Sequence, residues 1–323
     1  SHRRFFMPKV WNQRRRHKSD GGFLECPNGH GQGVPMRGKS KSTLHLEKMI
    51  VEIVEERYPI SVRGVCYALF TMGELKDMST KETKRISRVM TAMRESGEID
   101  WRKIADATRT TQRPSAWSNP SEIVEAAVAG YRRDAWQDQP VLVEVWSEKS
   151  TIAGVIDPVL QEYQVTFRVM RGFGSFTSVR QAAEDSLNIG HGQRGLVLYI
   201  GDHDPSGRYM SDVDLPTRLA RYGSEWDFKR VAVIEDDFQD LPWFSVDTKT
   251  KDGNRDWFIR RHGRKCYELD AMNPNDLRNR LSEQIETSLD LLKWESSRQI
   301  EEVEIASMRD FQRSFQETLH GRP

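Results

Sequence analysis

The chain has 323 residues, of which 37% are hydrophobic and 30% are charged, and its 49 Lys or Arg and 48 Asp or Glu give a formal net charge of +1. This length is enough for two domains with hydrophobic cores. The sequence excludes a disulfide framework, because it has only three cysteines, far apart, and a membrane-spanning chain, because no apolar run is long enough to cross a bilayer. We therefore expect a cytoplasmic protein with no membrane partner.

The positive charge is concentrated at the N-terminus. Residues 1–43 contain ten Lys or Arg and two acidic residues, a net charge of +8, so the remainder carries −7. This segment has little apolar periodicity, and we predict a basic, irregular arm in which Arg14, Arg15 and Arg16 bind nucleic-acid phosphates. A solvated tail that binds nothing is the alternative. A zinc site at Cys-Pro-Asn-Gly-His (26–30) is not predicted, because such a site needs about four ligands and the others are not found.

Residues 44–118 are predicted to form a winged helix-turn-helix domain. Apolar residues recur at helical spacing in three stretches, 44–59, 61–72 and 79–97. Ser79 and Glu82 match a capping box at the start of the third stretch. Ile99 and Trp101 then indicate a short strand, which a polar loop follows. Three short helices, a strand and a flexible polar loop are typical of a winged helix-turn-helix.

The third helix of this region is strongly basic. Four of its residues are predicted to contact DNA: Lys81, Lys84, Arg85 and Arg88. The alternative is a solvated basic face without a partner. Together with the basic arm, the helix favours double-stranded DNA as a partner and a location at the nucleoid.

A helix over residues 119–138 is expected to link this region to a second domain, 139–323. Asn119 and Pro120 are typical of a helix start. In the second domain, strand patterns alternate with helical patterns; the strands are expected at 141–146, 165–170, 196–200 and 230–234. This alternation predicts an α/β fold with a Rossmannoid parallel sheet covered by helices on both faces. A helical extension is expected from residue 275 through most of the C-terminus.

Acidic side chains follow two of these strands. Asp202 and Asp204 come directly after the third strand, in the sequence Asp-His-Asp-Pro-Ser-Gly, and Glu148 follows the first strand. Right-handed crossovers bring these side chains, with a glycine-bearing turn at 172–174, to the carboxyl edge of the sheet. Carboxylates this close repel each other unless a cation relieves the repulsion, and oxygen donors suit Mg²⁺ or Mn²⁺ rather than zinc. A solvated acidic turn is the alternative.

Arg63 and Tyr67 lie one helical turn apart in the second helix, where the arginine can sit beside the phenol or beside a phosphate. With the acidic residues, this pair makes the chain resemble the A subunit of topoisomerase VI, the meiotic double-strand-break transesterase and the stand-alone Mini-A topoisomerases of phages and plasmids. In that family, a winged helix with the motif Arg-Asp-Ile-Tyr-Tyr precedes a Toprim domain. The resemblance covers residues 44–222. Here the motif reads Arg-Gly-Val-Cys-Tyr, so Gly64 and Cys66 depart from it.

The resemblance implies a type II, DNA-cleaving transesterase that depends on Mg²⁺. Tyr67 would be the nucleophile, leaving a 5′-phosphotyrosyl link and a free 3′-hydroxyl, and Arg63 would neutralise charge on the phosphate. Glu148, Asp202 and Asp204 would bind the metal, which acts as a Lewis acid. The resemblance also implies a homodimer around duplex DNA, in which the tyrosine of one protomer works with the metal site of the other. A separate ATPase subunit is a further partner that the resemblance allows.

Three other interpretations are open from the sequence. A Toprim nuclease would use metal-activated water in place of Tyr67. A phosphatase of the haloacid dehalogenase type would use Asp202 as nucleophile. Asp236 and Asp237, which also follow a predicted strand and are a weaker candidate for an acidic site, would be further metal ligands. However, only 31 positions separate residue 204 from residue 235, which leaves little room for the strands that such an enzyme needs. A DNA-binding protein with a non-catalytic metal site would bind DNA without cleaving it.

Overall fold

The computed structural model describes residues 40–105, 115–170, 176–190 and 192–320. The described residues fall into two compact units. The larger unit comprises 42–105 and the described residues of 134–297, and the smaller comprises 40–41, 115–133 and 298–320. Among the described helices, none is long and apolar enough to cross a membrane.

The larger unit begins with three helices, α1 (Lys41–Arg57), α2 (Val62–Thr71) and α3 (Thr80–Ser96), at the places that the sequence predicts. Their apolar faces share one core, in which Ile50, Leu69 and Met90 are fully buried. The Ser79 side chain accepts a hydrogen bond from the backbone of Glu82 at 3.4 Å, so it caps α3 as expected. These three helices therefore form because each buries one apolar face against the other two.

The prediction of a strand at Ile99 and Trp101 is wrong. The chain instead forms a short 3₁₀ helix over Trp101–Lys103. The Asp100 side chain accepts a hydrogen bond from Arg102 N at 3.0 Å and caps this turn, which the propensities of the flanking residues did not indicate. An isolated parallel bridge between Ile60 and Ile104 follows.

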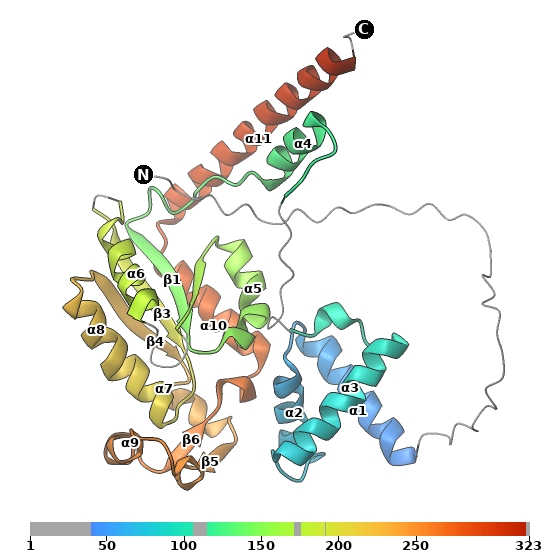
Figure 1. The fold of residues 1–323 in the computed structure, drawn as a ribbon, viewed down its shortest axis with the longest axis vertical. Coiled ribbons are helices and arrows are strands. Elements are labelled where there is room, and N and C mark those ends of the chain that lie inside the picture. The colour runs from blue at the N-terminus through green and yellow to red at the C-terminus, as the bar shows by residue number, and fades with distance from the viewer. Residues whose placement is uncertain (1–39, 106–114, 171–175, 191, 321–323) are drawn as a thin grey trace, which may run out of the picture. The chain divides into compact units, whose positions relative to one another are not determined.

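A four-stranded parallel sheet forms the centre of the larger unit, which confirms a mixed α/β fold (Figure 1). The strands are β1 (Val141–Ser147), β2 (Thr166–Val169), β3 (Arg194–Ile200) and β4 (Trp226–Ala232), in the order β2-β1-β3-β4. Ser147 at the end of β1 pairs with Ile200 of β3 and with Val169 of β2. The three strands therefore end level with one another, and the residues that follow them share one edge.

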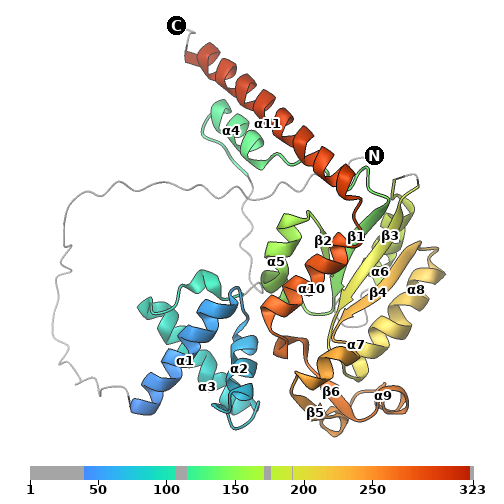
Figure 2. The same cartoon turned by 180° about the vertical axis from the view of Figure 1, so that it is seen from behind.

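Helices cover both faces of this sheet, as predicted (Figures 1 and 2). On one face, α5 (Ala153–Glu162) and α10 (Pro274–Glu286) pack against the sheet in a core that contains Val145, Ile156 and Leu281. On the other face, α6 (Phe176–Leu187) and α8 (Leu215–Arg221) pack around Trp146, Tyr199 and Leu215. A helix α7 (Pro205–Tyr209) begins directly after the Asp-x-Asp turn and runs through a π-helical turn into α8.

The region after β4 holds a small antiparallel pair, β5 (Trp243–Ser245) and β6 (Lys265–Tyr267), with α9 (Arg255–His262) between them in the chain. The C-terminal extension expected from residue 275 is helical, but it is divided into two helices, α10 and α11 (Leu291–His320). At the break, Asp290 exchanges backbone hydrogen bonds with the Gln139 side chain at 2.8 and 3.2 Å.

The smaller unit pairs α4 (Pro120–Gly130) with the C-terminal part of α11. The helix α4 starts at Asn119 as expected, since the Asn119 side chain accepts from Glu122 N at 3.2 Å. It ends at Gly130, well before the predicted end at residue 138. Trp136 is buried and donates its indole N–H to Tyr163 O at 2.7 Å, which holds it in the core of the larger unit.

Candidate active site

The Asp-x-Asp turn after β3 is fixed by its own hydrogen bonds. Asp204 caps α7 by accepting from Gly207 N at 2.8 Å. A side chain at Gly207 would place its Cβ 2.5 Å from the carbonyl oxygen of Asp202, so only glycine fits there. Beneath the turn, the guanidinium of Arg230 donates to the carbonyl oxygens of Gly201 and Asp202. The motif that is legible in the sequence is therefore a rigid loop that presents two carboxylates.

Glu148 reaches the same edge, as the strand order predicts. It follows Ser147, the last residue of β1, and β1 lies next to β3. Burial raises the pKa of Glu148, and the nearby carboxylates of Asp202 and Asp204 raise it further. A carboxylate whose ionisation is opposed in this way gains from a nearby cation.

In the structure, lysines supply the positive charge at the two aspartates. Lys149 Nζ lies 2.8 Å from Asp202 Oδ1, and Lys249 Nζ lies 2.9 Å from Asp204 Oδ2. Across the described residues, no three His, Cys, Asp or Glu side chains are grouped so that they could hold a metal ion. Residues 172–174, which the sequence places at this edge, lie outside the described residues.

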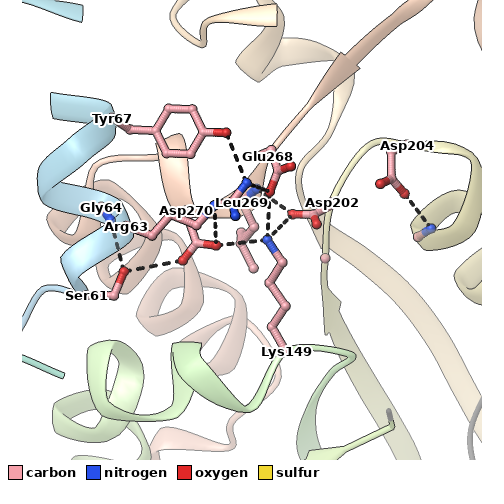
Figure 3. Close-up of polar contacts among 12 residues, drawn as sticks. Ser61, Arg63, Gly64, Tyr67, Lys149, Asp202, Asp204, Glu268, Leu269 and Asp270 are labelled. Carbon is pink, nitrogen blue, oxygen red and sulfur yellow. Dashed lines mark hydrogen bonds and ion pairs between the residues drawn. The ribbon is translucent and has the colours of Figure 1, made fainter. Parts of the chain in front are cut away.

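Two further carboxylates, Glu268 and Asp270, join the cluster from the segment after β6 (Figure 3). His203 and Tyr267 form an antiparallel bridge, with both backbone N–O distances at 2.9 Å, which holds the end of β6 beside the Asp-x-Asp turn. Lys149 Nζ consequently contacts Glu268 Oε2 at 3.1 Å and Asp270 Oδ2 at 2.9 Å.

Arg63 and Tyr67 of α2 face this acidic cluster (Figure 3). Arg63 Nη2 lies 3.5 Å from the Tyr67 hydroxyl and 3.0 Å from Glu268 Oε2. Asp270 is also tied to α2, because its Oδ1 accepts from Ser61 Oγ at 3.4 Å. The tyrosine, the arginine and the acidic edge of the sheet therefore meet in one place within a single chain.

The Tyr67 phenol is in its unreactive form in this arrangement. The residue is only 7% exposed. Burial and the nearby Glu268 carboxylate raise the pKa of Tyr67 to about 12, although Arg63 and Lys149 oppose this shift. At neutral pH the phenol is therefore protonated, and it needs both exposure and a proton acceptor before it can act as a nucleophile.

The site as a whole carries negative charge. Five carboxylates, those of Glu148, Asp202, Asp204, Glu268 and Asp270, face three cations, those of Arg63, Lys149 and Lys249, which leaves a formal charge of −2. An anionic ligand would be repelled by this charge unless a further cation entered or a carboxylate moved away.

The other residues singled out from the sequence lie apart from this cluster or beyond the described residues. The basic residues of α3 form an exposed face: Lys81, Lys84, Arg85 and Arg88. Arg14, Arg15 and Arg16, with the Cys26–His30 segment, lie outside the described residues. Asp237 is buried and paired with Arg280 at 2.5 Å, so it serves the packing of α10 rather than the site.

The sequence reasoning missed Lys149, Lys249, Glu268 and Asp270 as members of the site. Glu268 and Asp270 have the same i, i+2 spacing as Asp202 and Asp204, which is a partial signal, but the strand before them is only three residues long and is not recognisable in the sequence. Comparisons of the chain with models of protein families, with curated proteins and with solved structures returned no match.

Proposed function

We propose that the chain is a Mg²⁺-dependent, DNA-cleaving transesterase of the topoisomerase VI A-subunit type, in which α1–α3 belong to a winged helix and the parallel sheet to a Toprim domain. One observation carries this proposal: Arg63 contacts both the Tyr67 hydroxyl and Glu268, beside Asp202 and Lys149. A phenol, an arginine and an acidic sheet edge are the groups that tyrosine-dependent phosphoryl transfer requires.

In the proposed reaction, the Tyr67 oxygen attacks a backbone phosphorus and the bond from phosphorus to the 3′-oxygen breaks. The products are a 5′-phosphotyrosyl link and a free 3′-hydroxyl, to which the phenolic proton passes through solvent. Arg63, whose side chain is 52% exposed, neutralises charge on the non-bridging oxygens. Because Tyr67 is buried and its pKa is about 12, the reaction requires α2 to shift relative to the acidic cluster.

Glu148, Asp202 and Asp204 are the proposed ligands of Mg²⁺ or Mn²⁺. Their donor chemistry fits a hard cation, and a divalent ion would offset the formal charge of −2. When bound, such an ion supplies Lewis-acid polarisation of the phosphate. Lys149 contacts Oδ1 of Asp202 and Lys249 contacts Oδ2 of Asp204 in the structure, so an ion would either bind the other oxygen of each aspartate or displace the ammonium groups.

Double-stranded DNA is the proposed substrate, and the exposed basic face of α3 is its proposed docking element. The arm with Arg14, Arg15 and Arg16 would add phosphate contacts. A homodimer and a separate ATPase subunit are further proposals that follow from the resemblance. Arg63 contacts both Tyr67 and Glu268 of the same chain, so a site assembled within one protomer is the alternative to one shared between protomers.

A metal-dependent nuclease is the second candidate, and the burial of Tyr67 favours it. A phenol that is 7% exposed with a pKa of about 12 is a poor nucleophile, whereas a metal-activated water needs no tyrosine. Under this alternative, Tyr67 packs α2 against the site and Arg63 still neutralises the phosphate.

Cleavage of supercoiled plasmid in Mg²⁺, stopped with SDS and analysed with and without protease, separates these candidates. Transesterase activity gives broken DNA that carries protein until proteolysis, and Tyr67→Phe abolishes it while the matched Tyr222→Phe does not. Protein-free breaks that survive Tyr67→Phe and require Glu148 identify the nuclease. No cleavage together with intact DNA binding identifies a DNA-binding protein and removes both catalytic proposals.

Mixing the Tyr67→Phe and Glu148→Gln variants tests how the site is assembled. If the tyrosine of one protomer works with the metal site of another, the mixture regains cleavage that neither variant has alone. If each site is built within one chain, the mixture stays inactive.

A further inference from the structure

The ammonium of Lys149 has no hydrogen-bond donor to spare. A lysine ammonium has three N–H bonds, and here Asp202, Glu268 and Asp270 lie 2.8, 3.1 and 2.9 Å from Nζ. These carboxylates outweigh the opposing effect of burial and raise the pKa of Lys149, which keeps it charged. Lys149 can bind another anion only if one carboxylate leaves.

Glu268 is the carboxylate that bridges the two cations. Its Oε2 lies 3.0 Å from Arg63 Nη2 and 3.1 Å from Lys149 Nζ, so one oxygen accepts from both. A non-bridging oxygen of a phosphodiester has the same charge-assisted chemistry toward an arginine and a lysine. Glu268 therefore sits where a backbone phosphate would be bound.

Asp270 and Asp202 are held more firmly than Glu268. Asp270 is 4% exposed in its side chain and is anchored to Ser61, the residue that caps α2, whereas Asp202 accepts from Leu269 N at 2.7 Å. Glu268 is as exposed as Asp202, with 11% against 12% of the side chain, but its side chain is longer than that of either aspartate. Of the three, Glu268 is thus the one that can swing out while the others keep Lys149 in place.

We propose that Arg63 and Lys149 form a phosphate-binding pair and that Glu268 is a resident anion which a DNA phosphodiester displaces. This inference rests on the proposed function for the identity of the ligand. Displacement would bring the phosphate beside Arg63. The Tyr67 oxygen lies 3.5 Å from Arg63 Nη2, so the phosphate would also be near the phenol.

The exchange is tested by measuring, from fluorescence anisotropy, how tightly the 323-residue chain binds a labelled DNA duplex. Every protein carries Tyr67→Phe, and the buffer contains EDTA and no metal, so that no DNA is cleaved. Glu268→Gln removes the competing charge and is expected to tighten binding about tenfold. Glu235→Gln removes an equal charge from an exposed position outside the cluster and is expected to change the affinity little. If the Glu268→Gln protein binds the duplex no more tightly than the Glu235→Gln protein, the inference is overturned.

The cations are tested in the same assay. Lys149→Gln is expected to weaken binding and to reduce the slope of log affinity against log salt by about one, whereas Lys229→Gln leaves both unchanged. Because Lys149→Gln leaves three carboxylates without their cation and can unfold the chain, Arg63→Gln is the second variant, since its side chain is half exposed. Unchanged affinity in a folded Arg63→Gln protein overturns the inference.

Failure of this inference and failure of the proposed function are distinguishable. The binding assay does not require cleavage, so a protein that shows the expected affinities and never cuts DNA has the phosphate pair but not the activity. A protein that forms covalent DNA links while Glu268→Gln binds no more tightly has the activity but not the exchange.

Discussion

The pH dependence of unfolding tests whether Tyr67 rests in a buried, protonated state. The perturbation is Tyr67→Phe, which removes the hydroxyl and its proton but keeps the ring. The pKa of Tyr67 is raised from 10.0 to about 12, first by burial and then by Glu268. Below about pH 10 the phenol is protonated in both the folded and the unfolded chain, so it adds no pH dependence. Between about pH 10 and pH 12 the unfolded chain loses this proton while the folded chain retains it, and the free energy of unfolding falls as pH rises.

The magnitude follows from the two pKa values. A rise of two pKa units corresponds to at most ~2.7 kcal/mol, reached once the phenol is ionised in both states. At about pH 11, midway between the two values, the expected loss is ~1.4 kcal/mol. Tyr163 and Tyr199, whose pKa values are also raised, contribute equally to wild type and variant, so their effects cancel in the difference.

Urea unfolding of wild type and Tyr67→Phe at about pH 8 and about pH 11 provides the measurement. The stability of wild type relative to the variant is expected to fall by ~1.4 kcal/mol between the two pH values. A relative stability that does not change means that the folded phenol ionises with an ordinary pKa. A relative stability that rises with pH means that the pKa is lowered and the phenol is already activated. Either result refutes the conclusion that Tyr67 is buried and protonated in the resting protein.

Three further predictions concern the acidic turn, the metal and DNA. Gly207→Ala forces a Cβ to within 2.5 Å of Asp202 O, so we expect at least tenfold weaker Mg²⁺ binding by calorimetry; unchanged binding would show that the turn tolerates the shift. Because burial, Asp202 and Asp204 raise the pKa of Glu148, the affinity for Mg²⁺ is expected to fall with decreasing pH already above the usual glutamate pKa, a trend that calorimetry across pH checks. Changing the exposed Lys84 and Arg88 together to Gln should weaken duplex binding and lower the salt slope by about two; an unchanged slope would remove α3 as a docking element.

The parallel sheet and the meeting of Glu148 with Asp202 and Asp204 could be predicted because both follow from local patterns and one topological rule. Each strand is an apolar run that ends in a turn, and right-handed crossovers leave the residues after each strand at one edge. The start of α3 after Ser79 was predictable for the same reason, since its capping residues, Ser79 and Glu82, are only three positions apart.

The rest of the site depends on contacts between distant segments. Glu268 and Asp270 reach Lys149 only because the three-residue strand β6 docks through Tyr267 onto His203, and a strand this short has no legible periodicity. The break between α10 and α11 likewise depends on Gln139, far away in the chain, which binds the backbone of Asp290. Local propensity carries no information about either contact.

The composition of the cluster argues for a role beyond stability. Gathering Arg63 and Lys149 with three carboxylates removes much of their hydration, and such clusters commonly stabilise a fold no better than apolar contacts of the same volume. The segments that they join already share close backbone packing, as the contact of α2 with Leu269–Ala271 shows. Apolar side chains would hold that junction equally well. An ion cluster that can exchange one carboxylate for a phosphate, and that holds a phenol next to the exchange, is instead suited to a site that changes state when its anionic ligand arrives.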